Sequence, residues 1–467
     1  MTVVKSCMIW VTLMAALFSL PASAQGYDRY YGDLPVSVAM PELPRIAERE
    51  VNLADYGAAG DGVTLCTAAF SAAIDALAAA GGGRLVVPAG VWLTGPIVLK
   101  SGIDLHLERG AILVFTPDKR QHFRSGEYTG RADSGIYAEK CTDIAITGEG
   151  IIDGNGKYWR YAKREKLSDT EWKDLQGLGG SVSEDGKFWF PDHLKHFSDL
   201  TGSPEDEEAL RAHLIILKRC TRVLLSGVTI QNSPRFHVNP TRCTDVVMDG
   251  ITVRCPWNAQ NGDGIDIGNS ERVLVVNCRV DVGDDGICMK GGSGESGLSA
   301  GPCRDILIRD NIVFRAHGGF VIGSDFSGGM ERIVVKDCSF SGTDTGLRFK
   351  SAPDRGGVTK DIHISGITMN DIRDAAVTFK CDYSDVTYKD PGVAKDLRFM
   401  PHFTDIHISD VVCRECAVGV EASGIPGVDA VQGITLTDCT FFHLGEATRI
   451  DPATADIKLE NVRFLTY

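Results

Sequence analysis

The sequence predicts an all-β protein, a single-domain right-handed parallel β-helix, and three observations support this prediction. A short pattern of apolar and polar residues recurs from about residue 140 to the end, at steps of mostly 23 to 33 residues. A second strand pattern lies inside the same repeats. Many of the 52 glycines stand between short apolar runs, which is typical of a turn-rich β architecture.

The N-terminus has the pattern of a cleaved secretory signal peptide, residues 1–24. An apolar stretch from Met8 to Leu20 is too short to span a bilayer comfortably, and Ala22-Ser23-Ala24 matches a cleavage site. We therefore expect the mature chain to start near Gln25 and to be secreted or periplasmic. An uncleaved membrane anchor is the less favoured alternative. The remaining residues, 25–467, are expected to form one β-helix domain.

A helical cap is expected at the start of this domain, over Thr67 to Ala80. It leads into Gly81-Gly82-Gly83 and then an apolar strand. A helix there would cover the open first coil and hide a strand edge that could otherwise pair with another chain. No linker separates this part from the repeats.

The repeat that follows consists of a polar or turn residue, then apolar-x-apolar, then Gly, Asp or Asn. Such alternation over three or four residues predicts short half-buried strands. A period of this size without helical periodicity predicts a β-solenoid. The copies centre on residues 144–146, 223–225, 246–248, 273–275, 306–308, 333–335, 362–364, 406–408, 434–436 and 457–459.

A second column of strands lies within the repeats, each preceded by Gly or Ala. Coils that contain two aligned columns stack about 4.8 Å apart, with the outer residues of each triplet pointing in and the middle one out. The second column comprises Ile265-Asp266-Ile267, Ile287-Cys288-Met289, Phe320-Val321-Ile322, Leu347-Arg348-Phe349 and Val377-Thr378-Phe379.

One long insertion interrupts the repeats, at about residues 156–212. It contains Trp159, Trp172 and Trp189, and a short helix is expected over Asp169 to Leu175. Two interpretations remain open for this segment. It forms a lid or wall beside a substrate groove, or it is a surface excursion or end cap with no role in substrate binding.

Composition and charge exclude some functions. The net charge of −14 disfavours nucleic-acid binding, which needs a basic surface, although an acidic polymer could bind where Lys and Arg gather locally. Thirteen of the 14 cysteines remain after the signal peptide, so at least one is unpaired. Seven stand at fixed positions relative to the repeated strands, which favours small buried side chains over disulfides or metal ligands. They are Cys141, Cys220, Cys243, Cys303, Cys278, Cys338 and Cys439.

The candidate catalytic residues fall on consecutive coils. Asp263 and Asp285 precede equivalent glycines and should stack one coil apart, with Asp284 adjacent. His317 falls in the Asp284 column on the next coil. Arg348 and Lys350 follow on the coil after that, alternating with inward-pointing residues, so both cations should leave the outer face.

Three carboxylates, an imidazole and two cations in one patch fit glycoside hydrolysis. One carboxyl group must keep a proton for the leaving oxygen while others hold the attacking water. Crowded carboxylates raise one another's proton affinity, and Arg or Lys would bind a carboxylate on the sugar. Taken singly, each motif fits an ordinary turn or a solvated strand face. Their coincidence in matching columns favours a site.

These residues resemble glycoside hydrolase family 28, the polygalacturonases. The family pattern appears here in order as Asn261-Gly262-Asp263, Asp284-Asp285, Ala316-His317-Gly318 and Arg348-Phe349-Lys350. Asn232-Ser233-Pro234 also suits the family. The resemblance spans about Asp55 to the C-terminus, and one departure is Ala316 where the family usually has Gly.

The resemblance implies a role for each candidate. Asp284 is the general acid, Asp263 and Asp285 activate water with inversion, and His317 tunes the acid or steadies the substrate. Arg348 and Lys350 bind the galacturonate carboxylate, and Tyr383 is the candidate for a downstream tyrosine that the family uses. Coil stacking implies shorter carboxyl separations than the ~6.5–9.5 Å usual for inverting enzymes, so inversion follows from the resemblance alone.

The predicted function is hydrolysis of α-1,4-galacturonosyl bonds in pectin or polygalacturonate, with exo action favoured because the insertion could close one end of a groove. We expect a monomer that needs no metal or other cofactor and has neither a nucleic-acid nor a membrane partner. Three alternatives remain: a rhamnogalacturonan hydrolase of the same family, a Ca²⁺-dependent pectate lyase, and a non-catalytic adhesin or sugar-binding solenoid.

Overall fold

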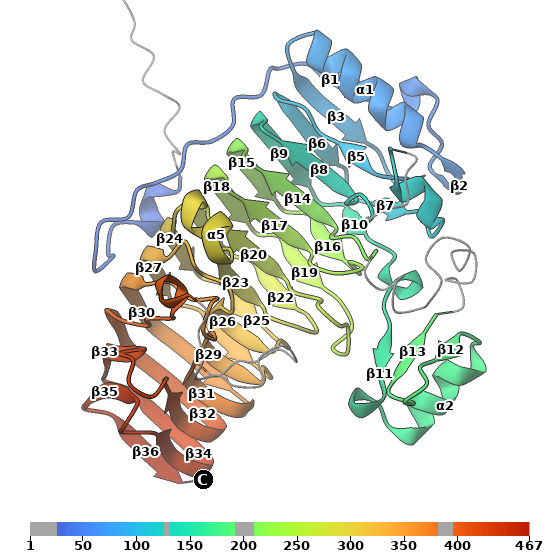
Figure 1. Ribbon diagram of the computed structural model, residues 1–467. Coiled ribbons are helices and arrows are strands. Elements are labelled where there is room, and N and C mark those ends of the chain that lie inside the picture. Colours follow the sequence, from blue (N-terminus) through green and yellow to red (C-terminus); the bar gives the residue numbers. More distant parts are fainter. Residues whose placement is uncertain (1–25, 126–130, 192–209, 382–395, 467) are drawn as a thin grey trace, which may run out of the picture.

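The computed structural model describes residues 26–125, 131–191, 210–381 and 396–466. The chain winds as a right-handed parallel β-helix whose coils join 33 strands into one continuous sheet, which confirms the predicted fold (Figure 1). Each coil contributes up to three short strands, and successive coils align these strands in three columns. We name them A, B and C in the order in which the chain passes through a coil.

Column A contains the strands of the recurring triplet, in the register expected from the sequence, and it extends further towards the N-terminus. Its members are β1 (Glu50–Asn52), β3 (Gly83–Val87), β6 (Ile103–Leu107), β9 (Thr142–Gly148), β15 (Thr221–Ser226), β18 (Thr244–Asp249), β21 (Glu271–Val276), β24 (Cys303–Arg309), β27 (Met330–Lys336), β33 (Val431–Thr437), β35 (Ala455–Glu460) and the first parts of β30 (Thr359–Asn370) and β32 (Ile406–Ser423).

Column B lies between the other two. Its separate strands are β2 (Asp61–Leu65), β4 (Gly90–Thr94), β7 (Ala111–Phe115), β10 (Ile151–Asp153), β16 (Thr229–Gln231), β19 (Thr252–Arg254), β22 (Arg279–Asp281), β25 (Ile312–Val313), β28 (Ser339–Ser341) and β36 (Arg463–Thr466). Near the C-terminus the long strands β30, β32 and β34 (Thr440–Ile450) pass through this column as well.

Column C carries the candidate site. It begins well before the first copy expected from the sequence, at β5 (Ile97–Val98) rather than at Ile265. It comprises β5, β8 (Ile136–Glu139), β14 (Ile215–Lys218), β17 (Val238–Thr241), β20 (Ile265–Gly268), β23 (Ile287–Lys290), β26 (Gly318–Gly323), β29 (Thr345–Lys350), β31 (Ile372–Lys380) and the ends of β32 and β34.

The polar residue that opens most triplets of column A is explained by its backbone. At eight of these positions φ lies between 51° and 61°, in the left-handed region where Asp is tolerated better than most residues. Arginine is less usual there, and each Arg is tied to the Asp one coil earlier. The pairs are Arg222–Asp143 (2.7 Å), Arg272–Asp245 (2.7 Å) and Arg332–Asp305 (2.6 Å).

The helices and 3-10 turns lie outside the three columns of strands. Helix α1 (Thr67–Ala79) ends one residue before the expected boundary and buries Phe70, Ile74 and Leu77 over the first coil, which confirms the predicted cap. Helix α5 (Gly294–Ala300) lies on the loop after β23. The 3-10 turns are η1 (Asp28–Tyr30), η2 (Leu53–Tyr56), η3 (Lys119–His122), η4 (Gly156–Tyr158), η5 (Arg164–Lys166) and η7 (Leu397–Phe399). None of the described helices is long and apolar enough to cross a membrane.

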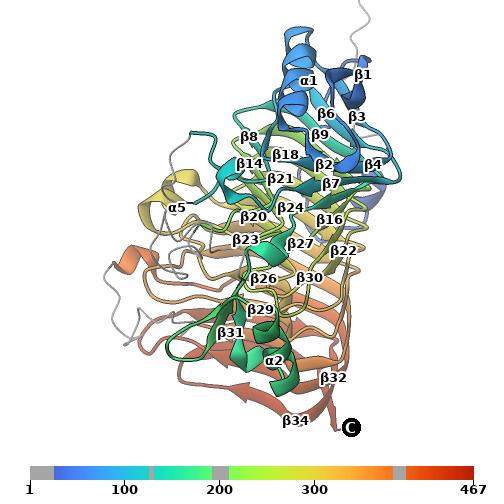
Figure 2. The same cartoon turned by 90° about the vertical axis from the view of Figure 1, so that its right-hand side faces the viewer.

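The insertion folds into a small unit of its own. Strands β11 (Ala162–Lys163), β13 (Phe188–Phe190) and β12 (Ser181–Val182) form an antiparallel sheet beside helix α2 (Asp169–Gly177). Ser168 and Glu171 form a capping box that starts α2 where the sequence predicts it. In Figure 2 this unit stands in front of the later coils of the solenoid.

An N-terminal strap, residues 27–45, runs along the outside of column A (Figure 1). Its backbone amides bond to the carboxylates of the Asp–Arg pairs, three strap residues for every two coils. The contacts are Ala39 N to Asp305 (3.3 Å), Glu42 N to Asp245 (3.2 Å) and Arg45 N to Asp143 (2.8 Å). Three extended residues span about 10 Å, close to the depth of two stacked coils.

The strap covers outward-facing apolar residues. Tyr30 and Val38 of the strap form a buried cluster with the middle residues of four column A triplets, Val247, Leu274, Leu307 and Val334. On later coils the same position is held by His363, His407, Thr435 and Lys458. The middle residue of the triplet therefore changes from apolar to polar at the coil where the strap no longer covers column A.

The cysteines behave as expected from their spacing. Of the 13 cysteines within the described residues, all but Cys141 and Cys255 are buried. Where the columns stack, neighbouring thiols meet, and Cys220 N donates to Cys243 Sγ at 3.4 Å.

Candidate active site

The turns that enter column C position the aspartates. Gly264 N donates to the carbonyl oxygen of Asp285 at 2.9 Å, so the coils of Asp263 and Asp285 are adjacent. A methyl group on Gly264 would stand 2.5 Å from the carbonyl oxygen of Gly286. The Asp-Gly dipeptide therefore recurs because only glycine allows these turns to stack so closely.

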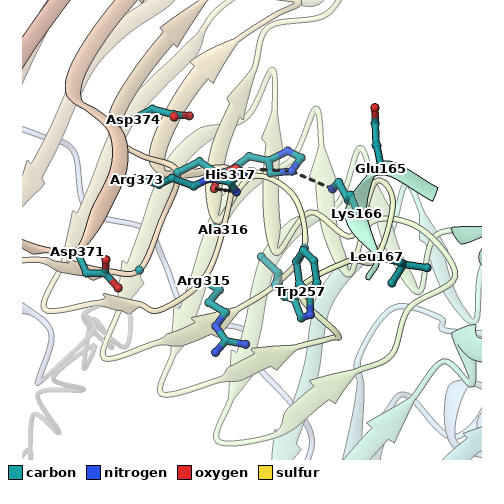
Figure 3. Close-up of a pocket in the computed structure, with 14 residues that line it drawn as sticks. Glu165, Lys166, Leu167, Trp257, Arg315, Ala316, His317, Asp371, Arg373 and Asp374 are labelled. Atoms are coloured by element: carbon teal, nitrogen blue, oxygen red, sulfur yellow. Dashed lines mark hydrogen bonds and ion pairs between the residues drawn. The ribbon is translucent and has the colours of Figure 1, made fainter. Parts of the chain in front are cut away.

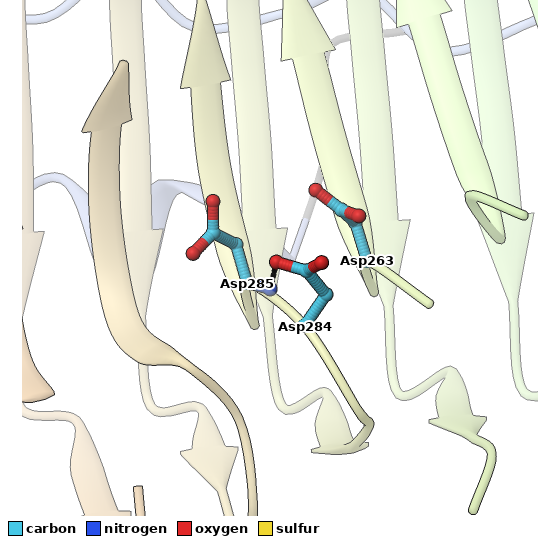
Figure 4. Close-up of side chains that lie close together, drawn as sticks. All are labelled: Asp263, Asp284 and Asp285. Atoms are coloured by element: carbon cyan, nitrogen blue, oxygen red, sulfur yellow. Dashed lines mark hydrogen bonds between the residues drawn. The ribbon is translucent and has the colours of Figure 1, made fainter. Parts of the chain in front are cut away.

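Three carboxylates meet at this edge. One oxygen from each of Asp263, Asp284 and Asp285 lies within 4.8 Å of the others (Figure 4). Asp263 and Asp285 are almost completely buried, with 3% and 1% of their surface exposed, and Asp284 is partly exposed. Oxygens at this spacing could hold one water molecule or one small cation between them.

Arg348 and Lys350, the two residues predicted to bind the substrate carboxylate, both form ion pairs with Asp285. Lys350 Nζ is 2.8 Å from Asp285 Oδ2, and Arg348 Nη1 is 3.1 Å from Oδ1. Both leave the outer face of β29 as predicted, but Lys350 is only 5% exposed. The side chain of Arg348 keeps 21% of its surface exposed and is the more open of the two.

A further ion pair, which the sequence pattern did not single out, lies next to the three carboxylates: buried Asp266 with partly exposed Lys290. Asp266, the middle residue of β20, points outward yet is fully buried. Lys290 at the end of β23 stands 3.4 Å from Asp266, 3.6 Å from Asp263 and 3.8 Å from Asp285. An acidic residue at the outward position of a triplet beside the Asp-Gly turns was the available signal.

Protons are distributed unequally over the four carboxyl groups. Burial, with the neighbouring carboxylates of Asp266 and Asp284, raises the pKa of Asp263 well above its ordinary value. Burial also raises the pKa of Asp266, to about 7. Burial acts in the same direction on Asp285, but Lys350, Arg348 and Lys290 outweigh it and hold its pKa far below the usual range.

Asp284 is governed by its histidine. Burial is the largest influence and raises the pKa of Asp284, but the hydrogen bond from His317 and the positive charges of His317 and Lys350 together outweigh it, so the net pKa is lowered. His317 Nδ1 lies 3.1 Å from Asp284 Oδ1, and His317 N donates to the carbonyl oxygen of Asp284 at 2.8 Å. Proton affinity is therefore lower on Asp284 and Asp285 and higher on Asp263 and Asp266.

A buried histidine on the preceding coil supports Asp263. His237 Nδ1 lies 2.8 Å from the carbonyl oxygen of Asp263, and its Nε2 accepts from Ser233 N at 3.2 Å. Burial lowers the pKa of His237 to about 4, so the ring is neutral and donates from Nδ1. Ser233 belongs to the Asn-Ser-Pro segment noted in the sequence, which here serves the backbone of Asp263.

A pocket of about 970 Å³ opens beside His317 (Figure 3). Turns between columns B and C form its floor, and the exposed indole of Trp257 and the exposed guanidinium of Arg315 line it. Glu165, Lys166 and Leu167 of the insertion form one wall. The described part of the insertion thus forms a wall of this pocket, and its role in substrate binding stays a prediction.

The insertion is anchored to the turns of the site by two buried arginines. Arg160 Nη1 donates to the carbonyl oxygen of Ser233 at 2.6 Å. Arg211 donates to the carbonyl oxygens of Pro234 and Gln260 and to the side chain of Asn261, each at 2.8 Å. Both ends of the insertion are thus fixed next to the coil of Asp263.

The structure brings together six of the seven predicted site residues: Asp263, Asp284, Asp285, His317, Arg348 and Lys350. Tyr383 lies outside the described residues. Lys166 joins the group from the insertion, with its Nζ 3.2 Å from His317 Nε2.

Comparison with known proteins agrees with this arrangement. The family model for glycosyl hydrolases family 28 matches residues 80–421. A probable polygalacturonase from Vitis vinifera is 28% identical over 424 residues, which cover 87% of this chain and 77% of that protein. An exo-poly-alpha-D-galacturonosidase from Dickeya chrysanthemi is 30% identical over 348 residues, which cover 72% of this chain and 57% of that longer protein. The crystal structure of a hyperthermoactive exopolygalacturonase from Thermotoga maritima is 28% identical, with a TM-score of 0.75 over 91% of this chain and 94% of that one.

Proposed function

The chain belongs to glycoside hydrolase family 28 and is a glycosidase, and from that premise we propose that it hydrolyses the α-1,4-galacturonosyl linkages of pectin or polygalacturonate. The single observation that carries this proposal is the meeting of Asp263, Asp284 and Asp285 within 4.8 Å beside His317. The polygalacturonase relatives support galacturonan as the substrate class.

In the proposed mechanism Asp284 gives a proton to the glycosidic oxygen while Asp263 and Asp285 hold and deprotonate the attacking water. Asp263 and Asp266 have a higher proton affinity than Asp284, so Asp284 must gain a proton before it acts. An anionic sugar supplies the cause, because a negative charge and the loss of water both raise the pKa of a nearby carboxyl group. Asp263 is the proposed source, since its carboxyl group lies within 4.8 Å of that of Asp284 and one bridging water could pass the proton.

Substrate binding is assigned to Arg348 and Lys350, with the pocket for further sugar units. Lys350 is buried against Asp285, so Arg348 is the more accessible of the two cations for a galacturonate carboxylate. Beside them, Trp257 offers a flat face for a sugar ring, and Arg315 has no ion pair with any described residue. A uronate carboxylate would complement that charge.

Replacing Asp284 with Asn tests the assignment of the acid. The amide cannot donate a proton to the leaving group with the strength of an acid, so kcat on polygalacturonate should fall by about a hundredfold or more. The unfolding temperature should stay unchanged. Asp281→Asn is the matched control, since Asp281 is an exposed aspartate three residues earlier on the same coil, and it should keep full activity. Full activity of Asp284→Asn would overturn the assignment.

Exo action is proposed because the insertion stands as a wall against the pocket that receives the chain. A closed end admits only a chain terminus, so galacturonate or a short product of one size should appear from the first minutes. A ladder of mixed oligomers would show endo action instead. The anomeric form of the first product, followed by proton NMR, tests inversion; retention of configuration would contradict it.

A calcium-dependent lyase is the competing chemistry to exclude. The three carboxylates could hold a cation, but Lys290, Arg348 and Lys350 already compensate their charge. A hydrolase should release reducing ends in the presence of chelator, without product absorbance in the ultraviolet. Loss of activity in chelator with an ultraviolet-absorbing product would replace the hydrolase with a lyase.

Export is proposed from the signal-like residues 1–24, which lie outside the described part of the chain. Expression of the full chain in a bacterial host, followed by N-terminal sequencing of the soluble enzyme, should give a start near Gln25. An intact N-terminus on a membrane-bound product would contradict this.

A further inference from the structure

Lys166 reaches the site from a part of the chain that is not solenoid. It ends the 3-10 turn η5, which follows strand β11 of the insertion. Its Nζ lies 3.2 Å from His317 Nε2, across 151 positions of sequence (Figure 3). The insertion therefore contributes a side chain to the inner edge of the candidate active site, besides forming a wall.

This contact determines which nitrogen of His317 carries the hydrogen. A lysine ammonium can only donate, so Nε2 accepts from Lys166 and the ring hydrogen stands on Nδ1. Asp344 Oδ2 also faces Nε2, but at 3.9 Å it lies beyond hydrogen-bond distance. Nδ1 is the atom that lies 3.1 Å from Asp284 Oδ1. The polar contacts thus run in one direction, from Lys166 through His317 to Asp284.

The surroundings keep Lys166 available for this contact. Within the described residues Lys166 forms no ion pair. Burial lowers the pKa of Lys166, and the carboxylates of Asp284, Asp344 and Glu165 oppose this effect from a distance. The turn that carries it is fixed by Arg164, which donates from N to the carbonyl oxygen of Lys187 at 2.8 Å and from Nη1 to that of Leu167 at 2.7 Å.

We propose that Lys166 is a positioning residue, which holds His317 in the Nδ1–H form and aims that hydrogen at Asp284. The inference rests on the proposed function only for its effect on turnover. Without Lys166 the imidazole could turn or change tautomer, and its acceptor nitrogen would then face Asp284. The resulting repulsion of lone pairs would move the carboxyl group away from the reacting linkage.

Three variants test the role in catalysis. Lys166→Met should lower kcat on polygalacturonate on the order of tenfold or more, with KM within about twofold, and Lys166→Arg should recover most of the loss because guanidinium also donates. Lys163→Met removes a charge from the same turn without touching His317 and should behave as wild type. Unchanged kcat in Lys166→Met overturns the proposal, and so does a raised KM with unchanged kcat, which would make Lys166 a substrate-binding residue.

A spectroscopic readout keeps the test independent of the reaction. Long-range ¹H–¹⁵N NMR of histidine-labelled enzyme should show His317 as the Nδ1–H tautomer in wild type and Lys163→Met, and a mixture or the Nε2–H form in Lys166→Met. An Nε2–H ring in the wild type overturns the proposal even if the enzyme is inactive on galacturonan. If the tautomer is as expected but galacturonan is not cleaved, only the proposed substrate is wrong.

Discussion

Asp266 shows what a single buried carboxyl group can do to the pH dependence of folding. It has no exposed surface, Lys290 at 3.4 Å is its ion-pair partner among the described residues, and burial raises its pKa to about 7. In the unfolded chain the same group titrates near its ordinary value of 3.8. The folded state therefore holds a proton that the unfolded state has already lost at neutral pH.

The pH dependence of stability follows from that difference. The contribution of Asp266 is fully present below about pH 4 and is lost as the pH rises through about 7, because the unfolded chain binds fewer protons over this interval. Asp266→Asn mimics the neutral form and should remove this loss, at most about 4 kcal/mol between pH 4 and pH 7. Thermal unfolding from pH 4 to pH 8 measures it, and an identical slope in wild type and variant would contradict the assignment.

For single residues, the sequence predicted which side chains form the site better than it predicted their charges and pKa values. Asp263, Asp284, Asp285 and His317 could be placed because each occupies a turn position that repeats from coil to coil. Asp266 and Lys290 could not, because an outward position of a strand says nothing about burial under side chains of later coils. Lys166 could not be found either, since the fold of a non-repeating insertion determines where it lies.

At the scale of elements, the insertion depends on Arg211. Its fully buried guanidinium satisfies two carbonyl oxygens and the side chain of Asn261, whose turn leads to Asp263. Arg211→Met would leave these acceptors unpaired in the interior, at a cost on the order of 3 kcal/mol in the free energy of unfolding. Denaturant unfolding should show this loss, with faster proteolytic cleavage between residues 156 and 212. Arg109→Met, which breaks only the exposed pair with Glu149, should change neither.

The turns between columns B and C predict a role for Trp257. Its ring is 44% exposed at the pocket, which is unusual for a large aromatic side chain without a partner to cover it. Trp257→Ala should raise KM about tenfold for oligogalacturonates that reach the pocket, through loss of ring stacking, and leave kcat nearly unchanged. Phe314→Ala is the control, because Phe314 is 42% exposed nearby but does not line the pocket. Equal effects of both variants would contradict a specific subsite.

Elements were predicted unevenly from the sequence. Column A could be recognised from the sequence because its triplets have apolar residues at both inward positions and a polar turn residue before them. Column B was not recognised, since strands such as β25 (Ile312–Val313) are too short to show alternation. Helix α2 begins at Asp169 as predicted, and the Ser168–Glu171 capping box that starts it is a local signal that needs no tertiary context.

At the scale of the whole molecule, the N-terminal strap covers the outer face of column A. Without residues 26–45, the middle residues Val247, Leu274 and Leu307 would face water as one apolar stripe. A chain shortened by this segment should unfold at lower temperature and self-associate, as judged by calorimetry and size-exclusion chromatography. Replacing the three residues with Thr, as at the uncovered Thr435, should restore the monomer. A stable monomeric truncation without those replacements would contradict this role.

The strap also limits how such a solenoid can change in length. Asp143, Asp245 and Asp305 each meet an amide of the strap, with an arginine coil between successive aspartates. Loss or duplication of a single coil in this region would place an arginine where a carboxylate must accept the hydrogen bond from a strap amide. The strap contacts would also fall out of register, because three strap residues correspond to two coils. Descendants of this chain can therefore gain or lose coils here only in pairs, accompanied by three residues near the N-terminus, whereas the coils after β27 are free to vary one at a time.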